Sequence, residues 1–448
     1  MIKFSFKSLA IASALTLSAF SASADENVNA FGVDPKISDL ALIYAGNARR
    51  PDWTQEDLTP YVTHKYADGT EDWFFDGFLF LEFDNGKVRF GNGGGLDPAK
   101  QEDWQWLIDE YFTPGKKLDA LDKLISEKKQ TLGEPPLRHK VVITCCAPVK
   151  ENDGNWSPRK PWGKIDGKNI YFGTPAGRIN AVKWYVDQII DKWNAAGYEN
   201  LDLEGLYWIE EGLYTNGEIM AEINDYIRSK GLRSYWIPYH PNNEQYWSNW
   251  KDKYKFDMCY IQPNYAFYMP APNNNSFYPK EQLNITVDAA KSCGAGLEFE
   301  FETQGKSNAM HSVNTELHQH INDYMDVYDE EGVFDNAGVA YYTGTQGLIH
   351  MDQSEDPVDH ETIDRLARYV AKRQKARVQS TGVKDIETDS VKTPLAYASE
   401  GRITLAPDTL CHDLSGRLLY TGAGDFACAA GIYIVSDHSG RSMKLYVK

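Results

Sequence analysis

The chain has 448 residues, with 64 acidic side chains against 46 basic ones, a formal charge of -18, and 13% aromatic residues. Binding to nucleic acid or to anionic membranes needs clustered Lys and Arg that neutralise phosphates, and the absence of a basic stripe argues against both partners. After the N-terminal segment no apolar run reaches the roughly 18 residues of a membrane span, so we expect no transmembrane helix.

The first 24 residues have the order of a secretory signal peptide. Lys3 and Lys7 precede an apolar stretch at residues 9–20, which ends in the small residues Ala22-Ser23-Ala24. A positive, then apolar, then small segment of this length directs export and is removed from the mature protein. We therefore expect a secreted, periplasmic or cell-surface protein.

Eight short β-rich apolar segments recur, and stretches with helical periodicity separate most of them. The segments are residues 40–45, 73–83, 140–146, 201–209, 234–239, 256–261, 296–301 and 338–342. Alternating strands and helices predict a parallel sheet, and eight such units predict an α/β protein with a closed (β/α)8 TIM-like barrel. The first crossover, residues 47–72, contains Pro51, Pro60 and Gly69 and no long helical pattern, which could make the barrel irregular.

The sequence lacks the usual signatures of cofactor and metal sites. A dinucleotide-binding sheet carries a Gly-rich turn after its first strand, whereas this chain reads Asn47-Ala48-Arg49-Arg50-Pro51 there. No CxxC, HExxH or Cys/His zinc spacing occurs, so we expect neither a cofactor nor a metal. Cysteine spacing alone leaves open whether Cys411 and Cys428 form a disulfide.

The chain pattern changes after the predicted barrel, which we assign to residues 25–376. Residues 377–395 are polar and aperiodic, as in a linker, and residues 396–448 contain short strands broken by Gly, which predicts a small β-sandwich-like domain. The runs Asp413-Leu414-Ser415-Gly416-Arg417 and Gly431-Ile432-Tyr433-Ile434-Val435 resemble the C-terminal sorting-type domain of secreted Bacteroidetes proteins. That resemblance implies lineage and export and does not bear on chemistry.

Two of the predicted barrel strands end in acidic clusters. The fourth is followed by Glu210-Glu211, and alternation along the seventh places Glu298, Glu300 and Glu302 on one face. Packing three acids against helices would cost a large desolvation free energy, so we expect them at the barrel interior or mouth. Hydrolysis of a glycosidic bond needs two carboxyl groups about 5–5.5 or 6.5–9.5 Å apart. Ion pairs with Arg or Lys, or calcium ligation, are the alternative uses of such acids.

Polar and aromatic side chains accompany these acids at neighbouring strand ends. Amide, phenol and imidazole groups beside aromatic faces suit a pocket that recognises sugar hydroxyls. A core role explains Tyr207 and Trp236 equally well, and Asp76 could instead pair with a barrel arginine. The predicted substrate-binding residues are Asp76, Tyr207, Trp236, Tyr239, His240, Gln262, Asn264 and Tyr265.

Several blocks occur in one order over residues 38–370: Leu40-Ala41-Leu42-Ile43-Tyr44, Phe75-Asp76-Gly77-Phe78, Gly205-Leu206-Tyr207-Trp208-Ile209-Glu210-Glu211, Trp236-Ile237-Pro238-Tyr239, Gln262-Pro263-Asn264-Tyr265 and Leu297-Glu298-Phe299-Glu300. In this order they resemble a family of bacterial secreted proteins known as domain of unknown function 4855. The resemblance implies a barrel protein of polysaccharide-degrading bacteria, similar to glycoside hydrolases with acids after strands four and seven.

We therefore predict an exported, monomeric glycoside hydrolase that acts on an oligo- or polysaccharide. Glu211, or else Glu210, is the predicted general acid/base, and Glu300, or else Glu298, is the predicted nucleophile or second carboxylate. Glu211 is favoured over Glu210 because the last residue projects furthest into the mouth. The alternatives are a non-catalytic glycan-binding protein on the same scaffold and a calcium-dependent adhesin.

Overall fold

The computed structural model describes Phe31 and residues 35–92, 95–150, 160–241, 243–266, 279–301, 314–344, 346–380, 396–399, 401–407, 409–413, 417–437 and 442–447. The chain divides into two units, with the boundary between Ser380 and Thr381. The predicted signal peptide, residues 381–395 of the predicted linker, and Glu302 lie outside the described residues.

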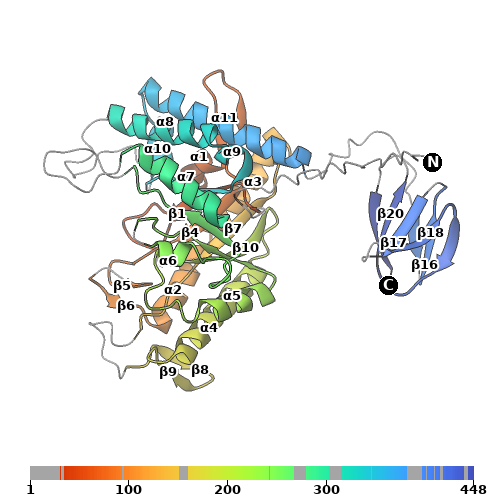
Figure 1. Cartoon of the computed structure of the whole chain (residues 1–448), viewed down its shortest axis with the longest axis horizontal. Coiled ribbons are helices and arrows are strands. Elements are labelled where there is room, and N and C mark those ends of the chain that lie inside the picture. The colour runs from red at the N-terminus through yellow and green to blue at the C-terminus, as the bar shows by residue number, and fades with distance from the viewer. Residues whose placement is uncertain are drawn as a thin grey trace, which may run out of the picture. The chain divides into compact units, whose positions relative to one another are not determined.

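Eight parallel strands in the first unit close into a barrel, which confirms the predicted fold (Figure 1). In chain order they follow one another around the barrel: β1 (Asp39–Tyr44), β4 (Gly77–Leu81), β7 (His139–Cys145), β10 (Leu201–Trp208), β11 (Arg233–Trp236), β12 (Met258–Ile261), β13 (Gly296–Glu300) and β14 (Val339–Tyr342). Each predicted segment overlaps one of these strands.

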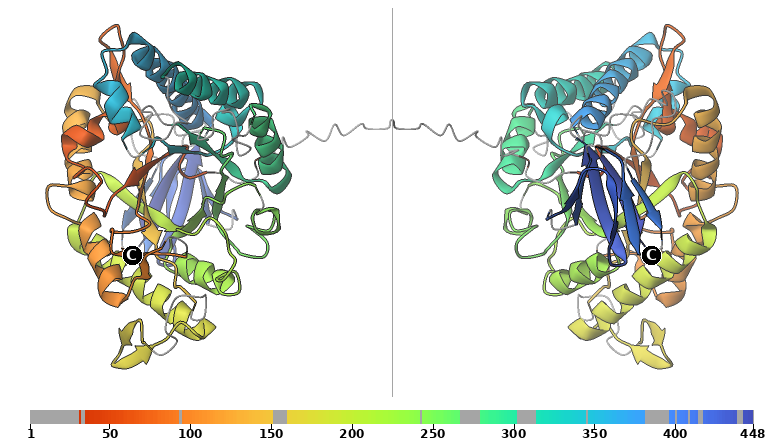
Figure 2. Two further views of the ribbon diagram at one scale, coloured as in Figure 1. Left: turned by 90° about the vertical axis from the view of Figure 1, so that its left-hand side faces the viewer. Right: turned by 90° about the vertical axis from the view of Figure 1, so that its right-hand side faces the viewer.

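The helices of this unit surround the strands (Figure 2). In Figure 1, α7 (Glu281–Cys293), α8 (Asn314–Glu330) and α11 (Pro357–Ser380) lie together on one side, and α2 (Gln101–Tyr111), α4 (Pro175–Ala196) and α5 (Met220–Ser229) lie on the other. Helix α3 (Lys117–Leu132) precedes β7. Helix α11 also covers the first residues of the predicted linker, since it continues to Ser380.

The first crossover is irregular, as its composition predicts. It contains the short helix α1 (Gln55–Val62), in which Pro60 lies, and an antiparallel hairpin of β2 (Thr63–Lys65) and β3 (Glu71–Trp73). The segment predicted as one strand at 73–83 is therefore split, because Trp73 ends the hairpin and the barrel strand begins at Gly77.

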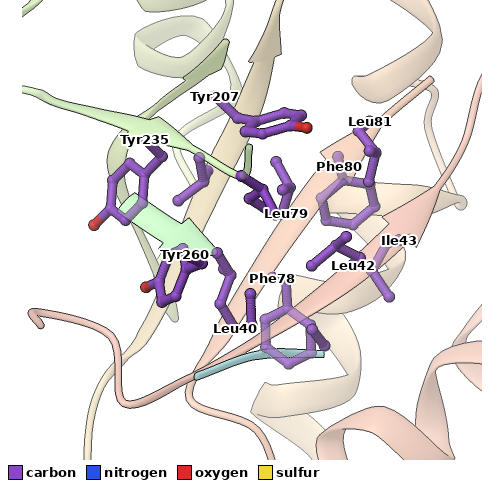
Figure 3. Close-up of a cluster of buried hydrophobic side chains, with 14 of the residues drawn as sticks. Leu40, Leu42, Ile43, Phe78, Leu79, Phe80, Leu81, Tyr207, Tyr235 and Tyr260 are labelled. Atoms are coloured by element: carbon purple, nitrogen blue, oxygen red, sulfur yellow. The ribbon is translucent and has the colours of Figure 1, made fainter. Parts of the chain in front are cut away.

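Large side chains fill the interior of the barrel where neighbouring strands carry glycine. A Cβ atom on Gly205 would lie 2.7 Å from the Tyr235 ring, and one on Gly296 would lie 2.9 Å from the Tyr260 ring. Figure 3 shows Tyr207, Tyr235 and Tyr260 projecting from three adjacent strands into one cluster with Leu40 and Leu79. The barrel is thus a packed core, and its accessible end is the one where the strands reach their carboxyl termini.

A buried ionic cluster holds the opposite, amino end of the barrel together. The carboxylate of Asp76 accepts hydrogen bonds from the backbone N–H groups of Ser38 (2.9 Å) and Asp39 (2.7 Å). Arg373 of α11 lies 3.2 Å from the Asp39 carboxylate, to which Tyr341 donates its hydroxyl at 2.8 Å. The helix thereby ties the start of β1 to the end of the unit.

This cluster corrects the expectation for Asp76. The residue immediately precedes β4, so it lies at the barrel end opposite the strand termini, away from the other predicted site residues. Burial, reinforced by the negative charge of Asp39, raises the pKa of Asp76 to about 6. Its role here is to accept the backbone N–H groups at the start of β1.

The second unit consists of two antiparallel sheets, as expected for the small β domain. One contains β15 (Ala396–Ser399), β16 (Arg402–Leu405) and β19 (Gly424–Ala427). The other contains β18 (Leu418–Thr421), β17 (Thr409–Asp413), β20 (Gly431–Asp437) and β21 (Ser442–Val447). Ile403, Cys411 and Val435 lie in their shared core, and Cys411 and Cys428 are both free thiols. The likeness to a sorting domain stays a prediction.

In the part of the chain that the structure describes, no helix combines the length and apolar character needed to cross a membrane.

Removal of the Arg373 side chain is expected to destabilise the barrel by about 3–5 kcal/mol, because Arg373→Ala leaves the buried Asp39 carboxylate without its cation. All 12 tryptophans precede residue 381, so denaturant unfolding followed by tryptophan fluorescence measures this unit. As a control, Lys123→Ala breaks a largely exposed pair with Asp119 on α3 and should change the free energy of unfolding by less than about 0.5 kcal/mol. Equal effects of the two substitutions would contradict the role of the cluster.

Candidate active site

A cavity of about 380 Å³ opens where the barrel strands end. Six strand ends supply its walls, and the side chains that line it are Tyr44, Glu211, Tyr239, Gln262, Asn264, Glu298, Glu300 and Tyr342. Three of the eight side chains are therefore carboxylic acids, and the others are phenols and amides. The residues come from parts of the chain nearly 300 positions apart, and only closure of the barrel brings them together.

Strand alternation explains why two of the acids share the cavity. Glu298 and Glu300 are two positions apart in β13, so both side chains lie on its inner face, as predicted. Phe299 between them lies on the other face, where its ring stacks on Tyr324 of α8 at 4.8 Å. The third predicted acid of this row, Glu302, is outside the described residues.

Glu300 is buried and receives several hydrogen bonds. The Tyr324 hydroxyl donates to its Oε2 at 2.5 Å, and the backbone N–H of Tyr265 donates to the same atom at 3.2 Å. Asn264 has a left-handed backbone (φ 59°), and its N–H group also supports the carboxylate. Burial nevertheless raises the pKa of Glu300 to about 8, with these hydrogen bonds opposing the rise.

Glu298 lies deeper in the barrel and is 3% exposed. Burial raises its pKa well above the usual range, and the negative charges of Glu300 and Glu211 raise it further. Tyr207 lies beneath the cavity close enough to Glu211 and Glu298 for both to raise its own pKa, after burial as the main cause. Tyr207 thus belongs to the floor below the cavity.

Glu210 and Glu211 are adjacent in sequence, but only Glu211 lines the cavity. The Glu211 side chain is accessible to solvent through the opening, although the surrounding protein raises its pKa by desolvation and the amide of Gln262 opposes that rise. β10 ends at Trp208, so the two residues belong to a loop in which strand alternation no longer applies.

The Glu210 carboxyl group is enclosed by amide donors outside the cavity. It accepts the backbone N–H of Asn92 at 3.1 Å and the side-chain amide of Asn216 at 3.0 Å, and the Asn92 side chain also donates to it. Burial raises the pKa of Glu210 to about 7 against these bonds. Glu210 therefore ties the loop after β10 to the segment around Asn92.

The predicted substrate-binding residues divide into two groups. Tyr239, Gln262 and Asn264 line the cavity. Asn264 donates its side-chain amide to the Tyr239 hydroxyl at 3.2 Å, and Gln262 donates to the carbonyl oxygen of Ile237 at 3.0 Å, so the three polar groups have fixed orientations.

The side chains of the other predicted substrate-binding residues lie behind the residues that line the cavity. Trp236 stacks on Phe256 at 5.1 Å and donates its indole N–H to the carbonyl oxygen of Glu210 at 2.7 Å. His240 stacks on Trp247 and forms a 3.0 Å hydrogen bond with Gln282, and Tyr265 donates its hydroxyl to Asp323 at 2.7 Å. Their side chains support the wall, and Tyr265 reaches the site through its backbone N–H.

Two lining residues, Tyr44 and Tyr342, were not predicted. Their rings meet edge to face at 5.6 Å between centroids. The Arg50 guanidinium lies 4.9 Å above the Tyr44 ring and forms two hydrogen bonds, of 2.8 and 3.0 Å, with the buried Glu82 carboxylate. Both tyrosines stand at the ends of predicted strands, which is the signal that could have separated them from core aromatics.

Among the described residues, no group of three or more His, Cys, Asp or Glu side chains is arranged to hold a metal ion.

No curated protein matches the chain. Among solved structures, it is similar to a double mutant of the endo-beta-1,4-mannanase of Cellulomonas fimi, with 12% identity and a TM-score of 0.39 over 94% of this chain and 95% of that one. An engineered protein aligns with 11% identity and a TM-score of 0.41 over the same shares. A mutant tryptophan synthase alpha-subunit of Pyrococcus furiosus aligns with 10% identity and a TM-score of 0.33, covering 75% of this chain and 97% of that one.

The sequence model of one family matches residues 39–368, which is more than half of the chain and spans the barrel from β1 into α11. Its description is "Domain of unknown function (DUF4855)", and the protein belongs to this family.

Proposed function

We propose that the protein is an exported glycoside hydrolase that cleaves an oligo- or polysaccharide between Glu211 and Glu300. The observation that carries the proposal is the convergence of Glu211, Glu298 and Glu300 in one cavity lined by phenols and amides. The raised pKa values of these acids support it, because a glycosidase needs one carboxyl group that holds a proton and one that is ionised.

Mutual repulsion prevents the three acids from all being ionised together. The influences on Glu298 all raise its pKa, whereas Glu300 is stabilised as an anion by the Tyr324 hydroxyl and by backbone N–H groups. As the pH rises, Glu300 therefore loses its proton before Glu298 does, and its ionised fraction grows as the pH approaches 8. We assign this ionised form of Glu300 to attack the anomeric carbon or to activate water, while Glu298 keeps its proton.

Glu211 is the acid in this scheme. Its pKa is raised, and its carboxyl group is open to the cavity, so it can donate a proton to the glycosidic oxygen as the bond to the anomeric carbon breaks. If Glu300 attacks, the water that later displaces it gives its proton to Glu211. If Glu300 instead activates the water, the proton passes to Glu300, and exchange with solvent restores both groups. Tyr239, Gln262 and Asn264 supply directional hydrogen bonds to sugar hydroxyls, and Tyr44 and Tyr342 supply aromatic surface.

Glu211→Gln and Glu300→Gln are each expected to lower turnover of a responsive glycan by at least about 10²-fold, because each removes a group that transfers a proton or attacks. The substrate is found by screening the wild-type protein against a glycan panel, and turnover is measured by reducing-end release. The control Glu222→Gln alters an exposed carboxylate on α5 that pairs with Lys183 and should leave turnover unchanged.

Wild-type protein that binds a glycan of the panel without cleaving it would instead support the non-catalytic glycan-binding alternative. Full activity in both Gln variants, with circular dichroism unchanged, would refute the assigned roles.

The free energy of unfolding is expected to fall as the pH rises from about 4.5 to about 8. Glu300 keeps its proton in the native state up to about pH 8, whereas an unfolded glutamate loses it near its ordinary value of 4.5. The native state therefore binds more protons in this window, and each such group contributes a slope of up to about 1.4 kcal/mol per pH unit.

Glu300→Gln should flatten this decline, as measured by denaturant titrations followed by tryptophan fluorescence at several pH values. Glu222→Gln should keep the wild-type slope. Parallel profiles for wild type and Glu300→Gln would show that Glu300 titrates normally in the native state.

A further inference from the structure

The loop that carries Glu211 also carries an exposed aromatic ring. Tyr214 follows Glu211 by three positions and is 68% exposed, the highest value among the large apolar side chains of the described residues. Its neighbours Leu213 and Asn216 are buried, so the loop itself is anchored and presents this one ring to solvent. Much of the aromatic surface of Tyr214 is therefore accessible to a ligand, and its burial by one would gain free energy.

The ring of Tyr214 is held in one orientation. Its hydroxyl donates to the side-chain oxygen of Asn243 at 2.6 Å, and Asn243 is itself 3% exposed. Tyr246, on α6 (Glu244–Trp247), packs its ring edge to face against Tyr214 at 5.2 Å between centroids. Residues that follow β11 thus fix a ring that belongs to the loop after β10. A rigid aromatic loses little conformational entropy on binding a ligand.

The ring of Tyr214 packs over the backbone next to Glu211. A Cβ atom placed on Gly212 would lie 2.4 Å from the Tyr214 ring, so glycine is required there for the ring to cover the backbone. Gly212 is the residue directly after Glu211, and Glu211 lines the cavity. The exposed ring therefore covers the chain one position beyond the acid.

We propose that Tyr214 is the platform for the sugar on the leaving-group side of the scissile bond. This inference rests on the proposed function: Glu211 protonates the glycosidic oxygen, so the sugar released with that oxygen leaves past Glu211 and its loop. The apolar C–H face of a pyranose packs on an aromatic ring, while the ring of Tyr214 stays fixed by Asn243 and Tyr246. The substrate class is accordingly an oligo- or polysaccharide with at least one sugar beyond the cleaved bond.

The test compares two substrates built from the sugar that the glycan panel identifies: an oligosaccharide of at least three units and the corresponding glycosyl fluoride. The fluoride carries no leaving sugar and needs little acid assistance. Tyr214→Ala should lower kcat/KM for the oligosaccharide by at least about tenfold and change that for the fluoride by less than about twofold. Tyr214→Phe, which keeps the ring and loses the hydroxyl bond to Asn243, should retain most of the oligosaccharide activity.

Ile285→Ala is the control, since Ile285 is 54% exposed on α7 and its loss should alter neither substrate. If Tyr214→Ala lowers kcat/KM equally for both substrates, or leaves that for the oligosaccharide unchanged, Tyr214 is not the platform. Either result leaves the proposed function standing. A wild-type protein that cleaves neither substrate would overturn both. Thermal unfolding of each variant verifies that the barrel is intact.

Discussion

Removal of carboxyl groups from water is the physical constraint on which this barrel depends. The interior that excludes water is built from aromatic and aliphatic side chains such as Tyr207, Tyr260 and Leu79. Any acid placed at its edge loses hydration and holds its proton more tightly. Acids lie at both edges of the barrel. The groups that offset the desolvation cost of these carboxylates differ between the two edges.

At the amino end a cation and hydrogen bonds offset part of the penalty, although burial still raises the pKa of Asp39 and Asp76, and at the carboxyl end hydrogen bonds alone offset part of the penalty for Glu300. Asp39 has a cation from Arg373 and a hydroxyl from Tyr341, and Asp76 has two backbone N–H groups. Among the described residues, no arginine pairs with Glu298 or Glu300, and the negative charge of Glu211 raises the pKa of both while that of Glu300 also raises the pKa of Glu298. The acids of the amino end thus join β1 to α11 through Arg373, whereas those of the carboxyl end hold their protons at a pH where an exposed glutamate is ionised.

The eight strands could be predicted because buried parallel strands are short apolar runs, and Glu298 and Glu300 because alternation holds inside β13. Alternation could not separate Glu210 from Glu211, because β10 stops at Trp208 before either residue. Glu211 was favoured, and it is the one of the two that lines the cavity. Asp76 was misplaced because a hairpin occupies part of an apolar run, and Tyr44 was missed because a mouth aromatic and a core aromatic are alike in sequence.

The support of Glu300 has a consequence for how this site can vary. Two of its donors are main-chain N–H groups, those of Asn264 and Tyr265, which only replacement by proline would delete. Their direction depends on the left-handed backbone at Asn264, a conformation that Asn, Asp and Gly adopt most readily. The hydrogen bonding of Glu300 therefore depends on the shape of a peptide turn, and the side chain of Tyr265 serves the surrounding wall through its bond to Asp323.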